Sequence, residues 1–212
     1  MGSFVVAITG ASGAPYGVRL LQALAELGWD VDLTITGPGF LVLQDELGWQ
    51  LDADSPQLEG AIKAYLNWPQ SRRLTYYHWQ DISGRLASGS YRTQGMIIIP
   101  CTMSTLSGIA TGRSSNLVER AADVMLKEGR PLVLVPRETP LNQIHLENML
   151  KLSQMGVKIV PAMPAFYQRP QTIDDMVNFV VGRVLDILGI EHQLYRRWSG
   201  QIGGETDAGI VS

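Results

Sequence analysis

The chain has a single cysteine, Cys101, among its 212 residues. A lone cysteine excludes an internal disulfide framework and fits a reducing compartment. Charged residues make up only 17 % of the chain, and a formal net charge of −3 does not indicate a nucleic-acid or anionic-membrane binder. The three histidines, His78, His145 and His192, lack the spacing of metal ligands, so we expect no metal site.

Targeting and membrane-spanning patterns are also missing. The first ten residues have no basic segment, and their apolar run is shorter than the core of a signal peptide. No apolar stretch approaches the roughly 20 residues of a spanning helix. We therefore expect a cytoplasmic protein without membrane or nucleic-acid partners. The absence of repeats and low-complexity linkers predicts one domain over residues 1–198 and a flexible tail over residues 199–212.

Apolar runs typical of strands alternate with segments of helical spacing. Two runs, GMIIIP at 95–100 and LVLVP at 132–136, are almost continuously apolar, as in strands buried on both faces. Further strands are predicted at 4–9, 31–36, 74–77 and 157–161, and helices at 18–27, 40–47, 58–66, 116–127, 143–154 and 172–188. This order predicts an α/β fold, a Rossmann-like (flavodoxin-like) open parallel sheet with helices on both faces.

Small and hydroxyl-bearing residues follow three of the predicted strands. These loops are Gly10 to Gly13 within TGASGAPYG, Thr36 to Pro38, and Cys101 to Thr105. In open parallel sheets, ligands bind beyond the carboxyl ends of the strands. For one such loop, N-capping of a helix is the simpler interpretation. Three loops at one sheet edge instead favour a cradle for a phosphate or a polar ring.

The first of these loops differs from three common motifs. No lysine follows it, so it is not the phosphate-binding loop of an NTPase. Ser12 stands where a dinucleotide-binding fingerprint has its second glycine. Ala14 replaces the glycine that a nucleophile elbow has two residues after its serine. Neither an NTPase nor a serine hydrolase is supported.

Several ionisable residues suggest a second anion site. Arg120 and Lys127 lie seven residues apart in a predicted helix, hence on one face, and Arg183 on the last helix could join them. Glu138 follows Arg137 at a strand end and could donate a proton to a leaving group. The alternatives are surface ion pairs for the cations and, for Glu138, an ion pair with Arg137 or a capping contact.

Together these motifs resemble one family. TGASGAPYG, ASGS, PCTMSTLSGIATG, NLVERAADVMLKEGRPLVLVPRETPL, IHLENMLKLSQMG and PAMPAFYQRPQT are similar to segments of the UbiX-type flavin prenyltransferases, and the likeness runs from about residue 4 to residue 198. The resemblance implies a flavin prenyltransferase domain with a Rossmann-like fold. It also implies a homododecamer built from trimers, with active sites at subunit interfaces.

The resemblance further implies the reaction. Reduced FMN would accept the dimethylallyl group of dimethylallyl monophosphate at N5 and C6, without a metal ion. The product, prenylated FMN, would serve as the cofactor of UbiD-type decarboxylases.

The resemblance assigns a role to each matching residue. The residues that would contact FMN are Gly10, Ala11, Ser12, Thr36, Thr102, Met103, Ser104, Thr105 and Arg137. Those that would bind the prenyl phosphate or line its cavity are Ala87, Ser88, Gly89, Arg120, Lys127, Tyr167, Arg183 and Trp198. The catalytic group would comprise Lys127 at the phosphate, Glu138 as its proton donor, and Glu46 with Ser12 in proton transfer near flavin N5.

Where relatives often carry a tryptophan facing the allyl group, this chain has Ile82, and Trp79 could substitute. Two other functions stay open at this point. An FMN-dependent decarboxylase of related fold would use a catalytic histidine, and only His78 follows a possible strand, in a segment of poor resemblance. A non-catalytic FMN carrier would not need the cations Arg120, Lys127 and Arg183.

Overall fold

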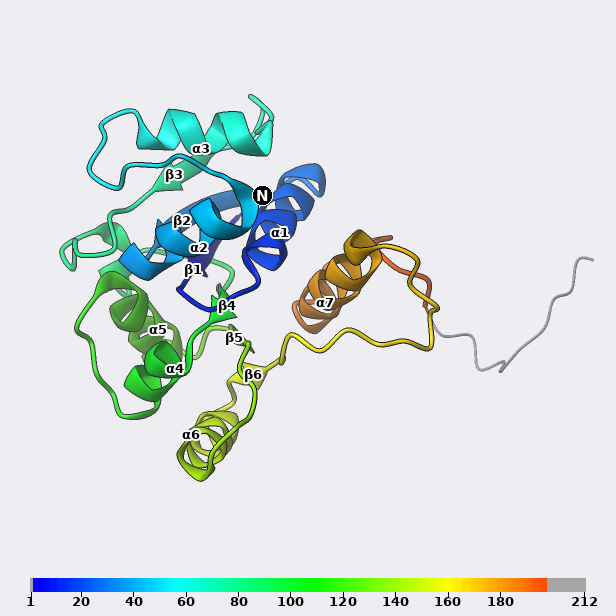
Figure 1. Cartoon of the computed structure of the whole chain (residues 1–212). Helices are drawn as coiled ribbons and strands as arrows, with labels where there is room; N and C mark the ends of the chain where they lie inside the picture. The colour runs from blue at the N-terminus through cyan, green and yellow to red at the C-terminus, as the bar shows by residue number, and fades with distance from the viewer. Residues whose placement is uncertain (1, 198–212) are drawn as a thin grey trace, which may run out of the picture.

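A computed structural model describes residues 2–197, which contain six parallel strands in one sheet (Figure 1). The strand order is β3-β2-β1-β4-β5-β6, the order of the doubly wound nucleotide-binding sheets. The strands are β1 (Ser3–Ile8), β2 (Asp30–Ile35), β3 (Leu74–Tyr76), β4 (Met96–Cys101), β5 (Leu132–Pro136) and β6 (Lys158–Ile159). The predicted open parallel sheet is confirmed.

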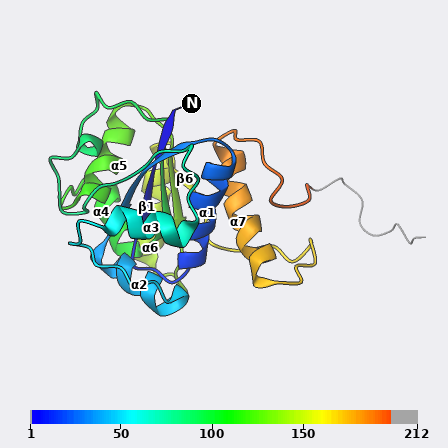
Figure 2. The ribbon, with the colours of Figure 1, turned by 90° about the horizontal axis from the view of Figure 1, so that it is seen from above.

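Helices cover both faces of the sheet (Figures 1 and 2). One face carries α1 (Ala14–Glu26), α2 (Gly37–Leu47), α3 (Leu58–Leu66) and α7 (Ile173–Ile187). The other face carries α4 (Met103–Ala110), α5 (Leu117–Lys127), α6 (Gln143–Gln154) and the short 3₁₀ helix η1 (Arg85–Ala87). None of the helices within residues 2–197 is both long enough and apolar enough to cross a membrane.

Burial on both sides explains the apolar strands. In β1, Phe4, Val6 and Ile8 pack into the core beneath α1, whereas Val5 and Ala7 pack into the core beneath α4 and α5. All six residues of β1 and of β4 are buried, so neither strand shows a polar alternation. The central sheet therefore leaves little room for polar chemistry except at the strand ends.

The predicted boundaries agree closely with the structure. Three elements, α3, β5 and α6, begin and end at the predicted residues. Helix α1 begins at Ala14 rather than at residue 18, because Gly13 caps it and a proline occupies its first turn. Strand β6 is shorter than predicted because it pairs only with β5 at the edge of the sheet. The proposed tail and Trp198 lie outside the described residues.

The connections that follow β1 and β4 leave the carboxyl edge of the sheet on opposite faces. This edge carries the candidate functional site. These two strands are neighbours, and α1 crosses directly over β4. A β-carbon at Gly17 of α1 would lie 2.7 Å from the carbonyl oxygen of Ile99, so only glycine permits this approach. The close packing fixes the start of α1 over the gap between the two strands.

This contact predicts opposite effects for two helix glycines. Gly17→Ala should destabilise the protein by about 1–3 kcal/mol, because α1 must move away from β4. The matched control Gly60→Ala in α3 meets nothing within 4 Å and should stabilise by about 0.5–1 kcal/mol. Thermal unfolding at one fixed protomer concentration measures both. Equal stability of the two variants would contradict the proposed close packing.

Candidate functional site

Three strand-end loops meet at the carboxyl edge of the sheet. Gly10 lies so close to Pro38 that a side chain at position 10 would collide with the proline ring, which presses the loops after β1 and β2 together. Gly13 has φ of 117°, in the left-handed region that favours glycine. The chain can therefore turn sharply from β1 into α1 beside the start of α2.

A buried hydroxyl joins the loops after β1 and β4. Thr9 Oγ1 donates to the Pro100 carbonyl at 2.8 Å and accepts from the Thr102 N–H at 2.9 Å, with Thr9 only 1 % exposed. Sequence reasoning missed this role of Thr9. The available signal was a single hydroxyl at the end of the apolar run FVVAI.

Glu46 of α2 caps the start of α1. Its carboxylate accepts from the Gly13 N–H at 3.0 Å and from the Ala14 N–H at 2.8 Å. A carboxylate complements the positive end of the helix dipole, as a bound phosphate would. A side chain of the protein therefore occupies the N-terminus of α1, next to Ser12, and the ligand cradle at these loops stays a prediction.

Arg137 spans the gap from the other side. Its Nε donates to the carbonyl oxygen of Ser12 at 3.0 Å, which links the end of β5 to the loop after β1. Neither Nη atom of Arg137 has a hydrogen-bond partner within residues 2–197. The adjacent Glu138 does not pair with Arg137 in this part of the chain; it is exposed and accepts from the Thr139 N–H at 3.0 Å.

The predicted FMN-contacting threonines act as helix caps. Thr36 Oγ1 accepts from the Gly39 N–H at 3.2 Å at the start of α2. Thr102 Oγ1 accepts from the Thr105 N–H and donates to Thr105 Oγ1 at the start of α4. Ala11, Met103 and Thr105 are buried, whereas Ser12 and Ser104 are exposed. The two serines are therefore the hydroxyls of these loops that are most accessible to a ligand.

The cysteine at the end of β4 is not a reactive thiol. Cys101 is fully buried, and burial raises the pKa of its thiol far above the usual range, which keeps it protonated. Its Sγ contacts the Thr102 carbonyl at 3.5 Å. Cys101 thus behaves as a small core residue. Within residues 2–197, no three histidine, cysteine or acidic side chains gather as they would around a metal ion.

A buried carboxylate fixes the turn between α4 and α5. Glu119 is 1 % exposed and accepts from Arg113 Nη2 at 2.7 Å and from Ser115 Oγ at 2.7 Å. Burial raises the pKa of Glu119, but the hydrogen bonds from Arg113 and Ser115 outweigh it and hold that pKa below its usual value. Arg113 Nη2 also donates to the Ser104 carbonyl at 3.2 Å, so this pair links the turn to the loop after β4.

Part of the predicted phosphate-binding set lies on the α5 side. Lys127 is the last residue of α5, and Arg120 pairs with Asp123 at 3.7 Å. The loop of Ala87, Ser88 and Gly89 is held near the end of the same helix, because Arg130 donates to the Gly89 carbonyl at 2.5 Å. Arg130 lies just before β5, so this loop is at the amino edge, opposite Ser12.

The other part lies on the α7 side. Arg183 Nη1 donates to Asp186 Oδ2 at 3.0 Å and to the Tyr195 hydroxyl at 3.3 Å. Tyr167 packs edge-on against Phe179, with ring centroids 5.9 Å apart. Figures 1 and 2 show α5 and α7 on opposite sides of the sheet. One protomer therefore does not bring Lys127 and Arg183 together, contrary to the single cluster that the sequence suggested.

An aromatic ring stands at the edge of the carboxyl-end loops. A β-carbon at Gly37 would lie 3.6 Å from Trp79 Cζ2, and the Trp79 carbonyl accepts from the Leu117 N–H at 2.8 Å. Ile82, which occupies the expected tryptophan position, is 56 % exposed. Trp79 rather than Ile82 thus borders the start of α2.

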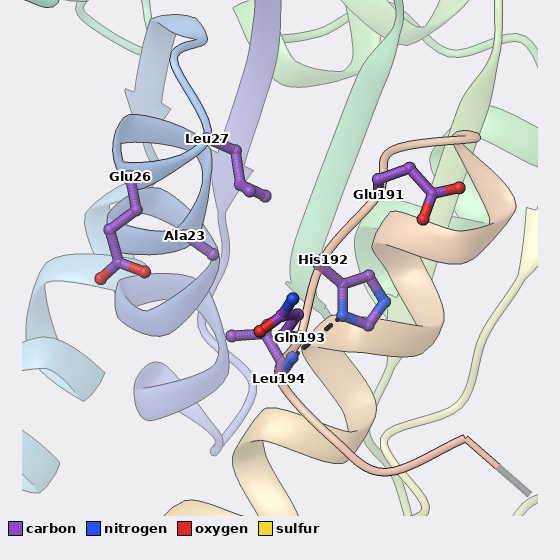
Figure 3. A pocket seen from close by; sticks show the side chains of 7 residues that line it. All are labelled: Ala23, Glu26, Leu27, Glu191, His192, Gln193 and Leu194. Atoms are coloured by element: carbon purple, nitrogen blue, oxygen red, sulfur yellow. Dashed lines mark hydrogen bonds between the residues drawn. The ribbon is translucent and has the colours of Figure 1, made fainter.

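One surface hollow lies away from these loops. It encloses about 510 Å³ between the end of α1 and the segment after α7 (Figure 3). The residues that line it are Ala23, Glu26, Leu27, Glu191, His192, Gln193 and Leu194. Because α1 runs from the carboxyl edge to the amino edge, this hollow is remote from Ser12 and Arg137.

Comparison with known proteins identifies relatives along nearly the whole chain. The family model described as Flavoprotein matches residues 2–185. A flavin prenyltransferase UbiX from Halalkalibacterium halodurans is 56 % identical over 197 residues, which is 93 % of each chain.

Two solved structures share the fold closely. AnUbiX (PadA1), in complex with FMN and dimethylallyl pyrophosphate, is 36 % identical with a TM-score of 0.82, over 95 % of this chain and 99 % of that one. A dodecameric FMN-dependent UbiX-like decarboxylase from Escherichia coli O157:H7 is 47 % identical with a TM-score of 0.81, over 93 % and 100 % of the two chains.

The capping contact of Glu46 predicts a graded loss of stability. Glu46→Ala should destabilise by about 1 kcal/mol, because two N–H groups at the start of α1 lose their acceptor. Glu46→Gln should lose less, since its amide oxygen can still accept. Denaturant unfolding measures both, with the exposed neighbour in Asp45→Ala as control. Wild-type stability of Glu46→Ala would contradict the cap.

Proposed function

The chain belongs to the UbiX-type flavin prenyltransferases of the flavoprotein family, and from this premise we propose how its residues carry out the reaction. It is a flavin prenyltransferase with FMN as prenyl acceptor. The main support for this function is the 56 % identity to a flavin prenyltransferase over 93 % of both chains. We propose that a dimethylallyl group is transferred from dimethylallyl phosphate to N5 and C6 of reduced FMN.

The carboxyl-edge loops suit FMN. Exposed Ser12 and Ser104 offer hydroxyls, and both Nη groups of Arg137 remain available for an anion. These residues lie on three loops that are linked by the hydrogen bonds of Thr9 and Arg137. Because Glu46 already neutralises the start of α1, we place the polar flavin ring, rather than the phosphate, against Gly10, Ala11 and Ser12. Thr36 and Thr102 cap the starts of α2 and α4, which fixes the two loops that we expect to contact the rest of the ligand.

Proton transfer falls to Glu46 and Ser12. FMN, when bound and reduced, supplies the electron-rich ring and the nucleophilic N5 and C6 atoms. The Glu46 carboxylate is fixed by the Gly13 and Ala14 N–H groups, immediately beside Ser12. A carboxylate held in one place next to an exposed hydroxyl is suited to pass a proton between ligand and protein.

The prenyl phosphate needs charge neutralisation before its C–O bond breaks. We assign Arg120, Lys127, Tyr167 and Arg183 to this phosphate and Glu138 to its protonation. Glu138 is exposed beside Arg137, where it is free to approach a ligand. Ala87, Ser88, Gly89 and Trp198 would line the cavity. Trp79 would supply the aromatic wall that Ile82 does not.

These assignments require more than one protomer. Lys127 and Arg183 lie on opposite sides of the sheet, so a shared phosphate must contact them from different subunits. Exposed apolar side chains mark surfaces for such contacts: Ile144, Leu146, Leu150, Met163, Phe166 and Ile173. We propose a homododecamer with active sites at subunit interfaces, in the cytoplasm, that passes prenylated FMN to UbiD-type decarboxylases.

The alternative functions fit less well. A decarboxylase would use a histidine at the ligand-binding edge. His78 follows β3, an edge strand that lies two positions from β1 in the sheet. Its Nε2 atom lies 3.6 Å from Asp54 Oδ1. A non-catalytic FMN carrier has no use for the cations of α5 and α7. Both alternatives predict that FMN leaves the protein unaltered in mass.

The reaction is tested by the mass of the flavin. Full-length protein incubated with reduced FMN and dimethylallyl monophosphate should yield FMN heavier by one dimethylallyl unit. A parallel incubation with the diphosphate establishes which donor is used. Flavin of unchanged mass with both donors would refute the transferase, and release of carbon dioxide from an added carboxylic acid would support the decarboxylase.

Shared sites are tested by mixing defective subunits. Lys127→Ala and Arg183→Ala should each be nearly inactive, but random co-assembly should restore about a quarter of the sites if the two residues come from different protomers. Lys127→Ala mixed with Arg120→Ala is the control, because both residues belong to one helix and no site becomes intact. No recovery in the first mixture would contradict an interfacial site.

A further inference from the structure

The last described segment, residues 190–197, folds back along α7. Gly182 permits this approach, since a β-carbon there would lie 2.5 Å from the Tyr195 ring and 2.7 Å from His192. The Tyr195 ring also packs against Phe179, with centroids 5.2 Å apart. Phe179 and Gly182 together form a docking surface for the segment.

Asp186 is the polar centre of this contact. Its carboxylate accepts from the Tyr195 hydroxyl, from Arg197 Nη2 at 2.8 Å and from His192 Nε2 at 3.1 Å. The Leu194 N–H donates to His192 Nδ1 at 3.1 Å, which assigns the ring proton to Nε2, facing Asp186. Burial raises the pKa of Asp186, but the hydrogen bond from Tyr195 and the charge of Arg197 outweigh it, so the carboxyl stays ionised.

Arg183 belongs to the same cluster. Its Nη1 contacts both Asp186 and the Tyr195 hydroxyl, whereas the side chain as a whole remains 48 % exposed. One edge of the guanidinium is therefore fixed and the rest stays available. A guanidinium held in advance loses less side-chain entropy when it binds an anion.

Tyr167 is linked to the same cluster through Phe179. Its ring packs edge-on against Phe179, and Phe179 in turn contacts Tyr195. The two side chains that we assign to the prenyl phosphate on this side of the protomer thus share one scaffold. The cluster also carries net positive charge, because two guanidiniums, Arg183 and Arg197, surround one carboxylate.

We propose that Asp186 is a positioning residue of the transferase. It holds Arg183 in the orientation that meets the prenyl phosphate, and the same carboxylate fastens residues 190–197 onto α7. The proposal rests on the proposed function of Arg183 as a phosphate ligand. By charge alone a nearby carboxylate would weaken anion binding, so the inference states that orientation outweighs this repulsion.

The test is the KM for dimethylallyl monophosphate, measured on the full-length enzyme with reduced FMN. Asp186→Asn should raise this KM about tenfold with kcat within about threefold, which is the pattern of lost substrate binding. Tyr195→Phe keeps the ring on Phe179 and Gly182 but loses the hydroxyl, and should raise the KM less. Asp174→Asn, in the first turn of the same helix, is the charge-matched control and should leave the KM unchanged.

The double variant Arg183→Ala/Asp186→Asn decides whether Asp186 acts through Arg183. If it does, Asp186→Asn adds nothing to the KM of Arg183→Ala. Multiplied effects, or an Asp186→Asn variant with lower thermal stability and wild-type KM, would overturn the inference and leave Asp186 as a stabilising residue only. A wild-type KM for Arg183→Ala would instead refute the proposed phosphate role of Arg183, and with it the premise.

Discussion

Burial of both faces of the central sheet is the constraint on which the rest of the structure depends. Every residue of β1 and β4 is buried, so polar groups can reach a ligand only beyond the strand ends or from the outer faces of the helices. The carboxyl edge accordingly collects Ser12, Ser104 and Arg137. The remaining cationic candidates, Arg120, Lys127 and Arg183, lie on α5 and α7, on opposite sides of the sheet.

Side chains of the protein satisfy most helix starts. Glu46 caps α1, Thr36 caps α2 and Thr102 caps α4, while asparagines or a threonine cap α5, α6 and α7. A bare helix start would bind a phosphate through its own N–H groups. Here the exposed hydroxyls and Arg137 remain for recognition, which favours a ligand with a large polar ring over a simple anion.

Much of the fold follows from local sequence patterns. Hydrophobic periodicity predicted the ends of α3 and α6, and the structure brings the small residues after β1, β2 and β4 to one edge of the sheet, as expected. Tertiary contacts were not accessible in the same way. Glu46 reaches the start of α1 from a different helix, and Thr9 acts across two strands, so neither role has a local signature.

The seven-residue spacing of Arg120 and Lys127 shows why the site was only partly predictable. Spacing places two cations on one helix face, but it does not say which side of the sheet that helix covers. The fold places Lys127 and Arg183 on opposite sides of the sheet, so the cations assigned to the phosphate do not form one site within a single protomer. In the proposed assembly, a prenyl phosphate meets its full complement of cations only between subunits. An allyl cation survives only where water is excluded. Placing the cations that neutralise the phosphate on different protomers therefore confines bond cleavage to the closed interface, where the same contact that completes the phosphate site also removes the water.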